Sequence, residues 1–192
     1  QSKGFCWDIK DDFSIDDCID TTKTGTGLGA FSSQISDLSE GTTYYVKSYS
    51  INKKGVGYSQ VESFITAVIT LPFLSTINTE NITNNQATIN AEVLNNGLGT
   101  ISARGVCWHT QNDFDINNNI GLNNEEGSLG EFSSIISGLT ENTTYYVKAF
   151  ATNEKGTAYG ETLEFNTSPI TLPEVTTLEI SGITINSAVG GG

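Results

Sequence analysis

The sequence predicts an all-β protein built from tandem β-sandwich repeats, and three observations support this fold class. The 192 residues include 20 Gly but only 3 Pro, and Thr, Ser and Asn separate short Val, Ile, Tyr and Phe runs. This interleaving is typical of short strands joined by turns. No segment sustains the 3.6-residue apolar period of a helix. The third observation is an internal repeat, which defines the domains.

Two copies of one pattern are related by a constant offset of 101 residues. The motif GFCW at 4–7 returns as GVCW at 105–108, TTYYVK at 42–47 returns at 143–148, and TLP at 70–72 returns at 171–173. We therefore expect a truncated first repeat at 1–71, a complete repeat at 72–172, and the leading strands of a third repeat at 173–192.

Within the complete repeat, alternation of apolar and polar residues predicts the strands. They are expected at 74–77, 87–93, 103–109, 130–136, 145–152 and 162–166. Turns are expected at 95–97 and 153–156, and an Asn-rich connection at 112–126. Six or seven strands in about 100 residues fit an immunoglobulin-like β-sandwich.

The first repeat lacks the two leading strands that 72–101 supply in the second, so we expect an apolar face and an open strand edge. Residues 173–192 offer Val175, Ile183, Ile185 and Ala188 to fill such a gap. Two alternatives stay open. Either both parts belong to one longer polypeptide, or the tail of one chain completes the first repeat of another. In both, incoming strands bury Trp7 and Tyr44.

The segment LTENTTYYVKAFA at 139–151 resembles the fibronectin type III pattern of Leu, a turn, then Tyr-x-Val-x-Ala-x-Ala. Together with RGVCW at 104–108 and GTAYG at 156–160, it resembles the fibronectin type III-like repeats of surface and secreted proteins of gliding Gram-negative bacteria. The resemblance covers essentially the whole chain; the first copy departs from it at Cys18, Ser48, Ser50 and Gly57. It implies a tyrosine corner at Tyr44 and at Tyr145, structural roles for Trp7 and Trp108, and a cell-surface or secreted location.

Charge limits the partners. The chain carries 9 Lys+Arg against 22 Asp+Glu, a net charge of −13, with no basic cluster. Phosphate binding needs local positive charge, so we expect no nucleic-acid or anionic-membrane partner. No apolar run approaches the roughly 18 residues of a membrane span, so membrane insertion is not expected.

No catalytic or cofactor-binding residue is expected, because the single histidine, His109, has no nucleophile or carboxylate in a motif around it. Asp113 and Asp115 are weak calcium candidates in a loop that only partly imitates a calcium-binding pattern. The alternative is a solvated loop.

Cys6 and Cys18 form a disulfide in one interpretation, which secretion would permit. In the other they are free, as Cys107 must be because it has no partner. The outward phase of one strand carries Tyr146 and Phe150, with Tyr45 and Tyr49 as counterparts. These aromatic residues form either a carbohydrate-binding face or cross-strand packing.

These observations and the resemblance together favour a non-enzymatic stalk or spacer of an extracellular bacterial adhesin or surface filament. Its partners would be neighbouring repeats, head-to-tail copies of the chain or surface glycans. Each repeat would add about 33 Å, and the short Thr-Leu-Pro links would limit bending. The alternative function is a carbohydrate- or protein-binding module attached to a secreted hydrolase or adhesin.

Overall fold

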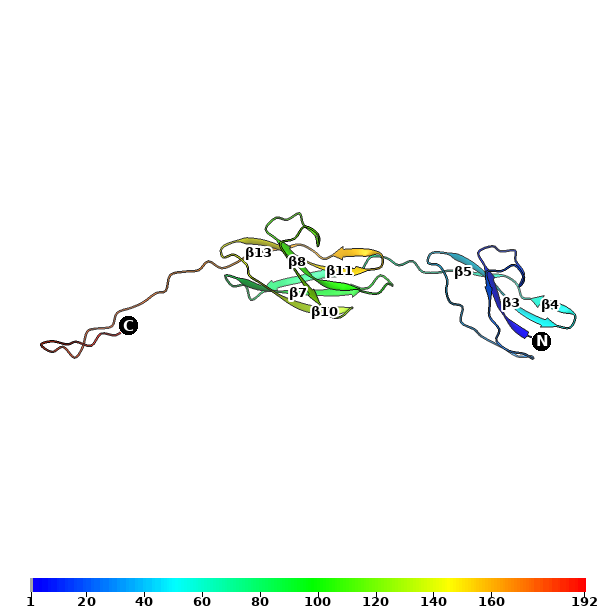
Figure 1. The fold of residues 1–192 in the computed structure, drawn as a ribbon, viewed down its shortest axis with the longest axis horizontal. Coiled ribbons are helices and arrows are strands. Elements are labelled where there is room, and N and C mark those ends of the chain that lie inside the picture. Colours follow the sequence, from blue (N-terminus) through cyan, green and yellow to red (C-terminus); the bar gives the residue numbers. More distant parts are fainter. Residues whose placement is uncertain (1) are drawn as a thin grey trace.

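A computed structural model describes residues 2–192, and the elements in this range are all β-strands. Two β-structured units follow one another along the long axis, and an extended C-terminal segment continues in the same direction (Figure 1). The predicted all-β class is confirmed. Within the described range, no helix is long and apolar enough to cross a membrane.

The complete repeat is a sandwich of two antiparallel sheets. One sheet has the order β10-β7-β6, formed by Gly130–Ser137, Gln86–Asn95 and Phe73–Glu80. The other has the order β12-β11-β8-β9, formed by Gly156–Tyr159, Thr144–Asn153, Ala103–His109 and Gly121–Glu125, with β13 (Leu163–Asn166) also paired to β11. This arrangement is an immunoglobulin-like sandwich, as the sequence predicts.

The inward-facing residues of both sheets form the core. One cluster surrounds Trp108 and Val147, and the other contains Ala149 and Ala151. The two sheets are joined at Thr76 on β6, whose Oγ1 accepts a hydrogen bond from the Ala149 N–H (3.0 Å). Gly160 allows this approach, because a Cβ there would lie 2.6 Å from the Thr76 nitrogen.

Two strands were missed by the sequence analysis. The Asn-rich connection contains β9, where the Asn123 side-chain amide donates to the Ile135 carbonyl (2.9 Å) and so ties this sheet to the other. After the predicted turn at 153–156, β12 pairs with the end of β11 before the chain reaches β13. The last strand of the sandwich is therefore split in two.

The first repeat contains only one of the two sheets. It consists of β1 (Ser2–Asp8), β2 (Asp20–Thr21), β3 (Thr43–Asn52), β4 (Gly55–Tyr58) and β5 (Glu62–Ile65). The register is that of the second repeat, with Trp7 opposite Val46 as Trp108 is opposite Val147. The counterpart of β10, residues 29–36, forms no strand.

The uncovered face of the first repeat is only partly buried. Trp7 and Tyr44 are buried without any incoming strand, whereas Phe64 is 37% exposed and its counterpart Phe165 only 4%. Residues 173–192 form no strand in this structure; a single bridge joins Ser181 to Val189. An isolated two-stranded hairpin is marginal in water because nothing covers its apolar side.

We expect Gly160→Ala to destabilise the second repeat by about 2 kcal/mol, since the new Cβ would displace β6 from the facing sheet. The free energy of unfolding is measured by Trp108 fluorescence in a Trp7→Phe background. The control is Gly57→Ala, on β4 of the first repeat, where nothing lies within 4 Å. Equal effects of the two substitutions on the second repeat would contradict this account.

Candidate functional site: the inter-repeat junction

The segment 66–72 between β5 and β6 is hydrogen-bonded to the repeat that precedes it. The Ile69 N–H donates to Glu40 Oε2 (2.8 Å), and the Gly41 N–H donates to the Ala67 carbonyl (3.3 Å). Both Glu40 and Gly41 lie in the turn that leads into β3. The start of the link is therefore held to the first repeat by hydrogen bonds that use the backbone groups of the link.

The same link is also bonded to the repeat that follows it. The Asn153 side-chain amide donates to the Thr70 carbonyl (2.7 Å) and to the Asn96 carbonyl (2.8 Å). The Thr70 N–H donates to the Gly97 carbonyl (2.8 Å). Gly97 has a φ of 67°, and a Cβ there would lie 2.1 Å from the Thr70 oxygen, so the contact requires glycine.

A carboxylate orders the loop that contacts the link. Both carboxylate oxygens of Glu154 accept the Thr100 N–H, at 2.8 and 3.1 Å. Backbone hydrogen bonds from its own N–H and from Thr100 hold the pKa of Glu154 below its ordinary value. Asn153 at the end of β11 and Glu154 in the turn after it therefore hold loop 96–100 in place beside the link.

The glutamate contact of this junction recurs 101 residues apart, and the asparagine recurs in the sequence. Glu141 Oε2 accepts the Ile170 N–H (2.6 Å), as Glu40 accepts that of Ile69. Asn52, the counterpart of Asn153, accepts the N–H two residues later in the same way (2.7 and 2.9 Å). The sequence analysis missed these residues, although the identity of Glu40 with Glu141 and of Asn52 with Asn153 was a visible signal.

The predicted tyrosine corners position the turns that supply these glutamates. The Tyr44 hydroxyl accepts the Ser39 N–H (3.0 Å), and the Tyr145 hydroxyl accepts the Thr140 N–H (2.9 Å). Each tyrosine ring stacks on a phenylalanine of the neighbouring strand, at 5.9 and 5.8 Å between ring centroids. Glu40 and Glu141 follow directly after the anchored residues.

The two predicted structural tryptophans lie on equivalent strands. Trp108 on β8 belongs to the core cluster and packs against Gly121, where a Cβ would lie 2.1 Å from its ring. Trp7 on β1 is 4% exposed. Neither tryptophan takes part in the hydrogen bonds of the link described above.

Phe150 and Tyr49, on the outward phase of their strands, are packed and not exposed. Phe150 is 2% exposed and packs with Cys107 and Phe114, and Tyr49 in the first repeat is also 2% exposed. Loop 110–120 covers this side: Phe114 and Ile116 pack on the cluster, and Lys148 Nζ lies over the Phe114 ring, 4.5 Å from its centroid. Tyr146 is half-buried at the edge of the same cluster. Of the two alternatives for Phe150, the structure has the packed one and not an accessible ligand face.

The carboxylate of Asp115 is engaged by backbone donors. Its Oδ1 accepts the N–H groups of Asn117 (2.6 Å) and Asn118 (3.2 Å), which closes a turn. Asp113 is exposed in the same loop. In residues 2–192, no three His, Cys, Asp or Glu side chains gather into a metal-binding group. His109 Nδ1 accepts the Gln111 N–H (2.8 Å).

Of the two alternatives for Cys6 and Cys18, the structure has the free thiols and no disulfide, and the thiol of Cys107 is also free. The Cys18 thiol donates to the Ile15 carbonyl (3.6 Å), which is the role of the Asn119 amide in the second repeat (2.9 Å to the Ile116 carbonyl). Cys18 thus supports a loop turn. Burial raises the pKa of Cys6 and of Cys107 to about 11.

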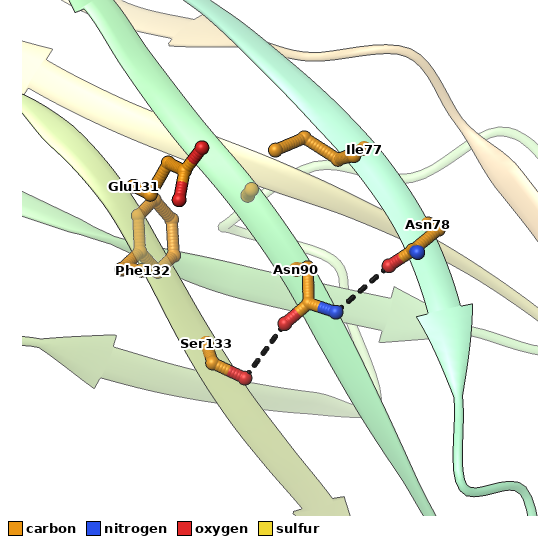
Figure 2. A pocket seen from close by; sticks show the side chains of 7 residues that line it. Ile77, Asn78, Asn90, Glu131, Phe132 and Ser133 are labelled. Carbon is orange, nitrogen blue, oxygen red and sulfur yellow. Dashed lines mark hydrogen bonds between the residues drawn. The ribbon is translucent and has the colours of Figure 1, made fainter.

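A shallow groove of about 400 Å³ lies on the sheet formed by β6, β7 and β10. Figure 2 shows Asn90 at its centre, where the side chain accepts the Ser133 hydroxyl (2.8 Å) and donates to Asn78 (2.8 Å). Glu131 and Ile77 lie at its rim. The amides and hydroxyl bond one another across the strands, so they stabilise the sheet surface.

No protein-family description matches the chain, and no curated protein matches it. Among solved structures, it is similar to the sensor domain of the anti-sigma factor RsgI4 in Pseudobacteroides cellulosolvens (16% identity, TM-score 0.38, 54% of this chain and 100% of that one). It is also similar to domains of titin (15%, 0.39, 67% and 41%) and of chicken CNTN1 (14%, 0.40, 87% and 56%). We take the fold from the strand order and not from these similarities.

We expect Cys18 to be alkylated well before Cys6 and Cys107 near neutral pH. Burial raises the pKa of all three thiols, but Cys18 is only half-buried, whereas Cys6 and Cys107 are fully buried and out of reach of the reagent. Peptide mass spectrometry after timed iodoacetamide exposure measures the order. Equal alkylation of all three cysteines in the folded chain would contradict the buried positions.

The raised pKa values also predict the pH dependence of stability. Thiols of the unfolded chain ionise near 9.0, whereas Cys6 and Cys107 stay protonated in the folded chain to about 11. The contribution of these protonated thiols to the free energy of unfolding is complete below pH 9 and is lost as the pH rises from 9 to 11. Denaturant unfolding across this range measures it, with Cys107→Ala as the variant that removes the contribution of the second repeat.

Proposed function

We propose that this chain is a non-catalytic structural segment of an extracellular bacterial adhesin or surface filament, in which it serves as a stalk or spacer. The observation that carries the proposal is the inter-repeat link, which is hydrogen-bonded to the repeat on either side of it. A spacer needs a defined direction from one repeat to the next, and a bonded link supplies it.

The chemistry of the link supports a fixed direction. A free segment of seven residues would bend in many ways. Here its backbone groups at Ala67, Ile69 and Thr70 are all engaged, and Pro72 is buried. Proline further restricts the last position of the link. Bending between the repeats therefore requires breaking several hydrogen bonds together.

The dimensions support an extended role. The longest strands of the complete repeat, β7 and β11, each have 10 residues, which corresponds to about 33 Å along the strand direction. The link enters this repeat at one end and the chain leaves it at the other (Figure 1). Each further repeat of this kind would extend the rod by a similar length.

The resemblance to repeats of bacterial surface proteins supports the extracellular location. The net charge of −13 is compatible with it, since acidic repeats repel one another and polyanions and stay soluble.

The groove around Asn90 favours a second candidate function, a carbohydrate-binding module. Its side-chain amides, the Ser133 hydroxyl and the exposed Ile77 are groups that contact sugars. A glycan array with the whole chain tests this candidate, with Asn90→Ala as the variant. Binding that Asn90→Ala abolishes would replace the spacer proposal by this one; no binding to any glycan agrees with the spacer.

We expect Asn153→Ala to loosen the junction, because the link loses the hydrogen bond from Asn153 to the Thr70 carbonyl, which is worth about 1 kcal/mol. Combination with Glu40→Ala, which removes the acceptor for Ile69, should loosen it further. Residual dipolar couplings measure how far the orientation of one repeat is fixed relative to the other. Small-angle scattering measures the maximum dimension of the chain.

The matched control is Asn52→Ala, which removes the same side chain from the first repeat, away from the link. It should leave the inter-repeat order unchanged. The spacer proposal fails if the unmodified chain already shows independent alignment of the two repeats, or a globular scattering profile.

A further inference from the structure

We propose that Cys6 and Cys18 form an oxidation site, at which a disulfide-bearing oxidant converts the two free thiols of the first repeat into a cross-link. The structure has the reduced state of this pair. The oxidant belongs to the class of small-molecule disulfides or of proteins that exchange disulfides with their substrates. The inference concerns the first repeat alone and does not depend on the spacer role.

The two thiols meet beneath loop 9–19, which joins β1 to β2. Cys6 on β1 is fully buried and forms a cluster with Phe13 and Tyr49. Cys18, near the end of the loop, packs against this cluster and is half-buried. Burial raises the pKa of the Cys6 thiol most, and the charge of Cys18 and a hydrogen bond between the two side chains raise it further. The two sulfur atoms are therefore neighbours in the folded chain.

Backbone hydrogen bonds hold both cysteines in place before any cross-link forms. The Ile19 N–H donates to the Trp7 carbonyl (3.0 Å). Ile19 and Trp7 directly follow the two cysteines in the sequence, so this bond fixes the distance between the two backbones. The Cys18 N–H donates to the Ser14 carbonyl (3.0 Å) and closes a turn. A cross-link to Cys6 thus needs a movement of side chains and not a new path of the loop.

The loop is also held by contacts that do not involve the thiols. Lys47 Nζ donates to the Phe13 carbonyl (2.8 Å) and lies over the Phe13 ring, 4.3 Å from its centroid. The Tyr58 hydroxyl accepts the Ile15 N–H (2.9 Å). The lysine–ring contact and the tyrosine hydrogen bond recur at the equivalent loop of the second repeat. The position of the loop therefore does not depend on Cys18.

The second repeat has the same site with an amide in place of one thiol. Cys107 is buried beneath the equivalent loop, and Asn119 stands where the first repeat has Cys18. The Asn119 amide donates to the Ile116 carbonyl (2.9 Å), whereas the Cys18 thiol makes only a longer contact with the Ile15 carbonyl (3.6 Å). The first repeat thus has a weaker turn contact at this position and a second thiol beside the buried one.

The oxidation takes place in two exchange steps. The half-buried Cys18 thiol loses its proton, and its sulfur attacks the disulfide of the oxidant, which forms a mixed disulfide and releases one reduced thiol. Cys6 then loses its proton, its sulfur attacks the Cys18 sulfur, and the second reduced thiol leaves. The pair gives up two protons and two electrons, and the disulfide of the oxidant becomes two thiols.

The second step is slowed by burial and helped by proximity. Burial raises the pKa of Cys6 to about 11, and the positive charge of Lys47 opposes this shift. The mixed disulfide at Cys18 lies next to Cys6, so the effective concentration of the attacking thiol is high. No external reagent has to reach the buried sulfur.

The cross-link would stabilise the first repeat only under oxidising conditions. It closes the chain between Cys6 and Cys18 and so restricts the unfolded state of this segment. A secreted chain meets such conditions after export. Loop 9–19 would then be joined covalently to β1, whereas the second repeat would keep its loop in place by hydrogen bonds and packing alone.

Oxidised glutathione acting on the whole folded chain tests the site. The chain is reduced first, and the reductant is removed before the oxidant is added. Peptide mass spectrometry without reduction should find Cys6 linked to Cys18, and Cys107 should stay outside any link within the chain. A chain whose only product is glutathione on Cys18 would overturn the proposal. A cross-link that forms only in denaturant, or that includes Cys107, would overturn it as well.

Two substitutions exchange the residues of the two repeats at this position. Cys18→Asn gives the first repeat the residue of the second, and it should abolish the cross-link and leave the fold unchanged. Asn119→Cys should give the second repeat a cross-link to Cys107, because the two loops have the same contacts. If Asn119→Cys gives no cross-link under conditions that close the first repeat, the geometric basis of the proposal is wrong.

Hydrogen exchange measures the effect of the cross-link on the loop. The N–H groups of Ile19 and Ile120 make equivalent hydrogen bonds, to the carbonyls of Trp7 and Trp108, and both bonds are 3.0 Å long. Oxidation should slow the exchange of Ile19 by at least about tenfold and leave that of Ile120 unchanged. In Cys18→Asn neither rate should change. An Ile19 rate that is the same before and after oxidation would refute the stabilising role.

Discussion

A β-sheet with one apolar face has to be covered, and the rest of this structure depends on how each repeat meets that requirement. In the second repeat β6, β7 and β10 cover it, and contact at Gly160 is close enough for Thr76 to bond the backbone of the facing strand. In the first repeat the equivalent sheet keeps its register without a cover. Strand pairing alone therefore maintains the register of each sheet. The apolar side chains of a sheet are protected from water only where a second sheet covers them.

The sequence predicted β7, β8 and β11 well because their apolar residues alternate, and β8 and β11 also recur at the 101-residue offset. It missed β9, whose Asn123 and Asn124 have low strand propensity. That strand exists because β8 offers a free edge and because the Asn123 amide finds acceptors on the other sheet. Such compensation depends on tertiary neighbours, which the local pattern does not describe.

The candidate site was harder to predict than the fold. Asn153 reads as an ordinary turn residue, and only its distances to Thr70 and Asn96 show that it joins a link to a loop. For Phe150 the alternation gave the correct side of the strand, but loop 110–120 covers that side. A side chain on the face of a strand that points away from the core is exposed only where no other segment packs against that face of the sheet.

The positions of the two chain ends of the second repeat have a mechanical consequence. The chain enters at Phe73 on β6 and leaves after Asn166 on β13, at opposite ends of the sandwich (Figure 1). Ladder hydrogen bonds of antiparallel strands are perpendicular to the strands. Tension applied along the chain therefore acts in shear across the β6–β7 ladder, where the bonds share the load instead of breaking one after another. Such a repeat resists stretching at the point where the chain transmits force.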